Sequence, residues 1–213
     1  MTATVTDKIT NWAAWLISTL LSPLLVPSYA IAIALWNSIL AIVPLSTKIH
    51  VLITVLLITG VLPAAFIFLL LRLKKVSDMS LSNPRERLIP FIINLLCYAG
   101  LVYALYLYHS PSWLIMFGVG GIVALIVTMI VNLRWKISAH GAAMGGLVAF
   151  IYMLILKQLT FLNLTSTLYL AVFLTGLVGM SRIIRERHTL MQGLAGIANG
   201  AIAVGVCVWL SFI

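Results

Sequence analysis

Charged residues are scarce in this chain, and acidic residues are the scarcest. Asp and Glu together number 4 among 213 residues, and charged residues of both signs make up 8% of the sequence. Soluble domains carry about 25% charged residues. Hydrophobic residues reach 63%. This composition excludes an ordinary water-soluble domain, and it predicts an all-α bundle of membrane-spanning helices.

Cysteine is also rare, which limits the kinds of site that the chain can build. The two cysteines, Cys97 and Cys207, both lie inside apolar runs. Buried thiols among membrane helices are expected there rather than a disulfide framework. The sequence contains no four-ligand pattern of Cys and His, so we expect neither a metal site nor a cofactor.

Long uncharged runs set the number of membrane crossings. Residues 51–71 and 189–213 contain no charge, and each run exceeds the roughly 20 residues that a helix needs to span about 30 Å of hydrocarbon. Residues 89–133 are too long for one crossing, and the break at residues 109–112 predicts a helical hairpin. Residues 15–36 contain two prolines and predict one kinked helix, followed by an interfacial segment.

These runs predict one membrane domain over residues 1–213 with six or seven crossings, because the first crossing is the least regular. The crossings after the first are expected at about residues 51–71, two helices within 89–133, 141–156, 166–180 and 193–212.

Basic residues gather on one face of such a bundle. The net charge is +9, with 13 Lys and Arg. With seven crossings, eleven of these basic residues lie on one face of the bundle, and only Lys48 and Lys157 lie on the opposite face. The eleven on the charged face are Lys8, Arg72, Lys74, Lys75, Arg85, Arg87, Arg134, Lys136, Arg182, Arg185 and Arg187. The positive-inside rule points this face toward the cytoplasm, but phosphate-binding residues also count as basic, so the side stays open. We expect a bacterial inner membrane, with lipid headgroups or a phosphorylated lipid as partners and no nucleic acid.

Three polar clusters interrupt the apolar sequence, and each follows an even-numbered crossing, so all three can share one face. They lie at residues 83–87, 136–140 and 181–192. In the third, His188 and Gln192 are four residues apart, which predicts that they lie on one helical face. The amide oxygen can accept a hydrogen bond from one ring N–H, which leaves the other ring nitrogen as a nucleophile. Arg182 can bring its planar donors to the same phosphoryl group.

The second cluster places a hydroxyl and an imidazole at the start of a helix. Ser138, Ala139 and His140 precede the expected crossing at residues 141–156. Backbone N–H groups at a helix N-terminus favour an anion. Ser138 can serve as an N-cap, as a phosphate ligand, or as both.

Together these residues resemble two motifs of the type 2 phosphatidic acid phosphatase superfamily. The family patterns are Pro-Ser-Gly-His and Ser-Arg-x5-His-x3-Asp. This chain has Ile137-Ser138-Ala139-His140 and then Ser181-Arg182-x5-His188-x3-Gln192. The third motif departs at Gln192, where the family has Asp. The family's first motif, Lys-x6-Arg-Pro, has only an altered counterpart around Arg85, Arg87 and Pro90.

The resemblance implies a metal-independent lipid phosphatase with a phosphohistidine intermediate. His188 would be the nucleophile, His140 would transfer the proton, and Gln192 would orient His188. The residues implied in phosphate binding are Arg85, Arg87, Lys136, Ser138, Ala139, Ser181 and Arg182. The substrate would be a lipid phosphate monoester or diphosphate of the phosphatidate, phosphatidylglycerol phosphate or polyprenyl diphosphate class.

Two other functions stay open from the sequence. Gln192 and the altered first motif are compatible with a non-catalytic relative that binds or moves phospholipids. A small anion transporter is a third possibility, although the chain shows no paired inverted halves.

Overall fold

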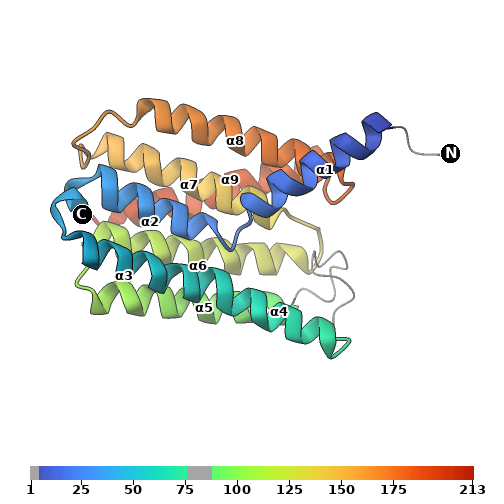
Figure 1. Cartoon of the computed structure of the whole chain (residues 1–213), viewed down its shortest axis with the longest axis horizontal. Coiled ribbons are helices and arrows are strands. Elements are labelled where there is room, and N and C mark those ends of the chain that lie inside the picture. The colour runs from blue at the N-terminus through green and yellow to red at the C-terminus, as the bar shows by residue number, and fades with distance from the viewer. Residues whose placement is uncertain (1–4, 76–87) are drawn as a thin grey trace.

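The computed structural model describes residues 5–75 and 88–213, and this part of the chain forms a bundle of helices aligned along one axis (Figure 1). The α-helices are α1 (Val5–Leu20), α2 (Val26–Asn37), α3 (Leu45–Leu56), α4 (Leu62–Arg72), α5 (Leu88–Leu107), α6 (Ser112–Asn132), α7 (Ala139–Leu156), α8 (Thr165–Ile184) and α9 (Leu190–Leu210). Within the described ranges no strand forms, so the prediction of an all-α bundle is confirmed.

Six helical segments in the described ranges are long and apolar enough to cross a membrane. They are Leu45–Arg72, Leu88–Leu107, Ser112–Asn132, Ala139–Leu156, Thr165–Ile184 and Leu190–Leu210. The first of these is continuous because a π-helical turn, η2 (Leu57–Val61), joins α3 to α4. These spans make the chain a membrane protein.

The expected first crossing is broken rather than kinked. α1 has 16 residues and α2 has 12, so neither alone reaches the roughly 20 residues of a full span. Pro23 lacks the N–H that would continue α1, and the next helix begins at Val26 with Pro27 in its first turn. α1 and α2 follow one another along the length of the bundle (Figure 1). Within residues 5–75 and 88–213 the chain therefore runs this length seven times, first in the two pieces α1 and α2 and then six times as a continuous span. The short 3₁₀ helix η1 (Ile39–Ile42) connects α2 to α3.

The remaining boundaries agree with the prediction to within three residues, except at two places. The second crossing begins at Leu45 instead of residue 51, because the helix takes in Lys48, whose Nζ donates to the Ala41 carbonyl. The helix before the third cluster ends later than expected. The hairpin turns between α5 and α6, where His109 adopts φ 50°. α8 continues to Ile184, past the expected end at residue 180, because residues 181–184 keep their helical hydrogen bonding. Ser181 and Arg182 consequently lie in the last turn of a helix rather than beyond it.

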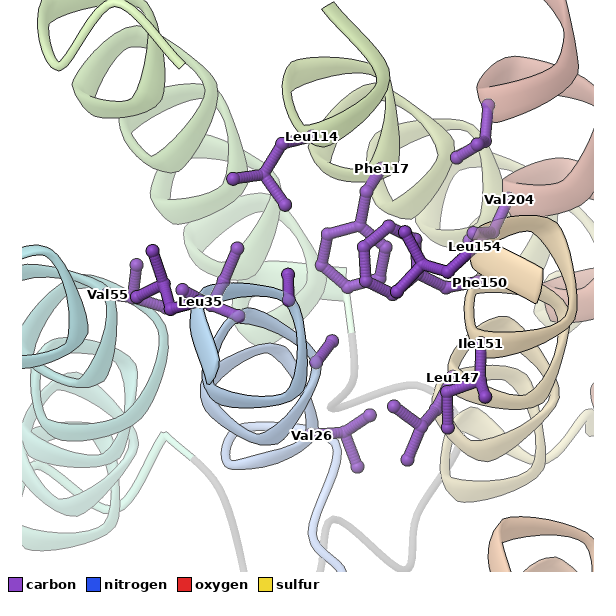
Figure 2. Close-up of a cluster of buried hydrophobic side chains, with 14 of the residues drawn as sticks. Val26, Leu35, Val55, Leu114, Phe117, Leu147, Phe150, Ile151, Leu154 and Val204 are labelled. Atoms are coloured by element: carbon purple, nitrogen blue, oxygen red, sulfur yellow. The ribbon is translucent and has the colours of Figure 1, made fainter. Parts of the chain in front are cut away.

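The core lies between the helices at the centre of the bundle, where Leu114, Phe117, Phe150 and Leu154 are buried (Figure 2). The rings of Phe117 and Phe150 lie 4.5 Å apart between centroids. These contacts hold α6 against α7.

Glycines allow α7 and α9 to touch backbone to backbone. A Cβ atom on Gly145 would collide with the Ile197 carbonyl, and one on Gly200 would collide with the Ala142 carbonyl. Small residues at such crossings let membrane helices approach closely. Since α7 and α9 both begin at the same end of the bundle (Figure 1), this contact determines how the residues around His140 and His188 face each other.

Candidate functional site

The chain reversal between α8 and α9 places His188 next to Arg182. The Arg187 N–H donates to the Arg182 carbonyl at 2.9 Å, and the Glu186 N–H donates to the Ile183 carbonyl at 2.8 Å. This pairing is a Schellman motif with Glu186, at φ 52°, in the left-handed position that glycine usually occupies. The His188 N–H also donates to the Arg182 carbonyl, at 3.3 Å. The five-residue spacing is therefore one tight reversal that returns the histidine to the arginine.

Gln192 contacts His188, but not for the predicted reason. His188 precedes α9, so the two residues do not share a helical face. Thr189 is the N-cap, and the Gln192 Oε1 accepts from the Thr189 N–H at 3.2 Å in a capping box. The same oxygen accepts from His188 Nδ1 at 3.3 Å. Because an amide oxygen only accepts, this bond gives His188 the Nδ1–H tautomer, with the ring's lone pair on Nε2.

His140 lies in the first turn of α7, and its ring is oriented by α1. Ser138 is the N-cap of α7, as the sequence allows, and its Oγ accepts from the Gly141 N–H at 3.1 Å. His140 Nε2 donates to the Ser18 carbonyl at 3.1 Å. The last carbonyls of a helix have no intrahelical donor, so the end of α1 near Pro23 provides the acceptor that orients this imidazole.

Ser18 is a residue of the site that the sequence did not indicate. Its hydroxyl lies 2.8 Å from the hydroxyl of Ser181. Ser181 Oγ donates its own hydrogen to the Val178 carbonyl at 2.7 Å, so the Ser18 hydroxyl is the donor between the two serines. Ser18 thereby connects α1 to α8 with its side chain and to α7 with its backbone. A serine in an apolar run carries no signal of this role, because such residues commonly pack helices together.

A cavity of about 610 Å³ joins the histidines with two arginines. His140, Arg182, Arg185 and His188 all line it. The side chains of Arg182 and His188 are 5% and 8% exposed, and both lie close enough to His140 to act on it electrostatically. One imidazole from α7 and one from the α8–α9 reversal therefore line the same cavity, together with two arginines.

Four of the other predicted site residues lie in this wall or next to it. Ala139 lines the cavity. Ser138 and Ser181 are each 1% exposed and support the wall from behind through the bonds described above, as does Gln192. Lys136 is half-buried in the connection between α6 and α7. Arg85 and Arg87 lie outside the described residues.

Arg185 is a second residue of the site that the sequence analysis did not select. It follows α8 directly and lines the cavity. Burial, and then the nearby charge of Arg187, lower the pKa of its guanidinium. Crowded cations at the rim of a cavity favour an anionic ligand there.

Among residues 5–75 and 88–213, no three His, Cys, Asp or Glu side chains come together as a metal-binding group. The donors that the cavity offers are imidazole and guanidinium nitrogens, which suit a phosphoryl group.

No protein-family model matches the chain, and no curated protein or solved structure matches it either. Its function is therefore inferred from its residues and their geometry.

Proposed function

We propose that the protein is an integral membrane phosphatase that hydrolyses a lipid phosphate monoester or diphosphate. The observation that carries this proposal is the convergence of His140 from α7 and His188 from the α8–α9 reversal on one cavity beside Arg182. The histidines are 48 positions apart in the chain, so their convergence is a property of the fold. It is also what a two-step phosphoryl transfer requires, since the reaction needs a nucleophile and a separate proton carrier.

In the first step, His188 Nε2 attacks phosphorus, and His140 gives a proton to the leaving oxygen as the P–O bond breaks. Arg182 and Arg185 bind the equatorial oxygens, where their charge stabilises the transition state. In the second step, water attacks phosphorus while His140 takes up a proton from the water, and the bond between phosphorus and His188 Nε2 breaks. Phosphate leaves, and both histidines return to their starting states without a metal or cofactor.

Lipid is the substrate class that fits this location. The cationic residues lie at one end of membrane-spanning helices, and the rest of the cavity is lined mainly by apolar residues of α2, α4, α5, α6 and α7. Phosphatidate, phosphatidylglycerol phosphate and polyprenyl diphosphate all present the same phosphoryl group. We propose that the protein acts on such a lipid in a bacterial inner membrane.

One observation favours a second function, a non-catalytic protein that binds or moves phospholipids. Gln192 occupies the position of the resembling family's Asp, and its neutral oxygen is shared between His188 and the Thr189 N–H. An amide orients an imidazole but cannot stabilise its cation by charge, so a binding protein would tolerate Gln at this position.

Phosphate release from purified protein distinguishes the two functions. With phosphatidate, phosphatidylglycerol phosphate and a polyprenyl diphosphate each presented in detergent with EDTA, we expect release from at least one lipid. His188→Ala should lower the rate by 100-fold or more, on the order of the loss expected for a reacting group. His50→Ala, a substitution at the other end of the bundle, is the control and should retain the rate. Lipid binding without release from any of the three would favour the second function.

A further inference from the structure

We propose that the apolar part of the cavity is a chamber for one hydrocarbon chain, so that the tail of the substrate enters the bundle instead of staying in the bilayer. This inference rests on the proposed function, because the phosphoryl group would anchor the ligand at the histidine end. It adds a site that selects the substrate by the length of its tail.

Helical spacing shows that the chamber continues directly from the histidine. On α7, His140, Ala143 and Gly146 follow one another at intervals of three residues, and all three line the cavity. Residues three apart lie on the same helical face. This face of α7 therefore leads from the imidazole into the bundle along small side chains that leave space beside them.

The opposite walls show the same pattern. α4 contributes Ala64 and Ile67, with Gly60 one turn earlier in η2. On α6, Thr128 and Phe117 mark the two extremes of the wall. They are eleven residues apart, so the cavity extends about 16 Å along this helix. The buried Phe117, packed on Phe150, and Val204 of α9 close the deep end.

Two of the polar side chains along the chamber, those of Asn94 and Thr128, form hydrogen bonds within the protein. Asn94 Nδ2 donates to the Pro90 carbonyl at 2.8 Å, and Thr128 Oγ1 accepts from Asn199 at 3.0 Å. Buried polar groups that already have partners do not require a polar ligand. The walls below the histidines thus suit a hydrocarbon chain.

The cavity opens beside α1. Trp15 and Thr19 both line it and are exposed, with 46% of Trp15 accessible. Tryptophan is the side chain typical of the membrane–water interface. A lipid whose headgroup lies at this level can reach the arginines while its tail turns inward.

The volume of the chamber allows it to hold one hydrocarbon chain. Its volume of about 610 Å³ lies within the roughly 300–1,000 Å³ of sites for single small ligands. A tail that leaves the bilayer gains little hydrophobic energy, since lipid and chamber are both apolar. Selection must then come from fit, and a chain longer than the chamber is disfavoured.

A series of single-chain alkyl phosphates from hexyl to octadecyl tests this inference in the full-length protein. For the wild type, the rate of phosphate release should rise with chain length to an optimum and then fall. Ala124→Leu and, from a different helix, Ala64→Leu place a larger side chain in the chamber. Both should move the optimum at least two methylenes shorter and lower the rate for the longest chains about 10-fold. Ala198→Leu makes the same change on an exposed position of α9 and should leave the profile unchanged.

A binding measurement separates failure of the chamber from failure of the proposed function. Non-hydrolysable alkyl phosphonates of the same lengths should raise the Tm of the wild type with the same optimum, because a ligand that binds only the folded state stabilises it. If no lipid releases phosphate, but the Tm shift has this optimum and the optimum moves in Ala124→Leu and Ala64→Leu, the proposed chamber is supported and the proposed phosphatase activity is rejected. The chamber would be overturned if rates and Tm shifts did not depend on chain length. It would also be overturned if Ala124→Leu and Ala64→Leu had the same chain-length profile as Ala198→Leu.

Discussion

Gln192 is the residue at which this site differs most from a charged His–carboxylate pair. Its Oε1 accepts from both His188 Nδ1 and the Thr189 N–H. The side chain therefore caps α9 and orients the proposed nucleophile with a single atom. A carboxylate in the same place would keep both hydrogen bonds and would also stabilise positive charge on the phosphorylated ring.

Substitutions at Gln192 should separate these two contributions. Gln192→Glu keeps the capping box, which accepts Glu or Gln at this position, and we expect phosphate release to rise several-fold. Gln192→Leu removes the acceptor from His188, and we expect kcat to fall about 100-fold, within the range for proton-transfer and positioning groups. Steady-state kinetics measures both.

Helix content by circular dichroism is the control for Gln192→Leu, because loss of a cap costs about 1 kcal/mol of helix stability. A Gln192→Leu variant that folds and turns over at the wild-type rate would contradict the orienting role.

At the scale of the helices, the contact between α7 and α9 aligns the two halves of the site. Gly145 and Gly200 allow the backbones to meet, and Gly196 approaches the Ser138 carbonyl at the N-terminus of α7. The Ser138 N–H in turn donates to the Gln192 carbonyl at 3.2 Å. The residues adjoining His140 and His188 are thus hydrogen-bonded across the contact.

Gly200→Ala should separate these helices. The added methyl group would collide with the Ala142 carbonyl, and overpacking of this kind costs about 1–3 kcal/mol. We expect a lower Tm and reduced phosphate release. Gly193→Ala on the same helix meets open space, so its Tm should stay within the small gain that Ala brings to a helix. Equal Tm values for the two variants would show that the close contact is unimportant.

The boundaries of the helices could be predicted from the sequence where a local feature, such as an uncharged run or a proline, determines them. Uncharged runs located the spans, Pro23 explains the end of α1, and residues 109–112 marked the hairpin. The spacing between Arg182 and His188 has a local cause, since a Schellman reversal followed by a capping box brings these two residues together. The side chain of Ser138 was predictable as a cap for the same local reason.

The parts that the sequence did not predict depend on contacts between distant segments. Ser18 joins the site only because α1 packs against α8, and Arg185 joins it only because the reversal turns toward α7. The break in α1 exposes the carbonyl that orients His140, and no local pattern shows which side chain will reach it. The end of α8 was placed too early because Ser181 and Arg182 are polar, although a helix can bury such residues when another helix covers them.

At the scale of the whole molecule, seven passages place the site and the C-terminus at opposite ends of the bundle (Figure 1). Lys48 and Lys157 lie at the end away from the site. Lys157 Nζ lies 3.7 Å from the centroid of the Trp209 ring, and Lys48 Nζ donates to the Ala41 carbonyl at 2.7 Å. These contacts hold both lysines at the far end, and the other basic residues that the structure describes, such as Arg134, Arg182 and Arg185, lie at the end that carries the site.

Cysteine labelling tests this arrangement. In a Cys97→Ser and Cys207→Ser background, Arg134→Cys reports on the site end and Asn163→Cys reports on the far end; both positions are exposed. A membrane-impermeant maleimide applied to intact cells should label one of the two and should label the other only after the membrane is permeabilised. Labelling of both from the same side would contradict the crossing of the membrane by α7, which separates these two positions.

The central claim is that His188 carries the phosphoryl group and His140 moves the proton, and trapping the intermediate tests it most directly. Protein incubated with a lipid substrate bearing ³²P in the transferred phosphate is quenched in alkali, in which phosphohistidine survives, and the labelled residue is identified by peptide mapping. The account predicts acid-labile label on His188, slower loss of that label in His140→Ala during a chase with unlabelled substrate because water is no longer activated, and no label in His188→Ala. Label that persists in His188→Ala, or rapid phosphate release with no label in either the wild type or His140→Ala, would contradict it.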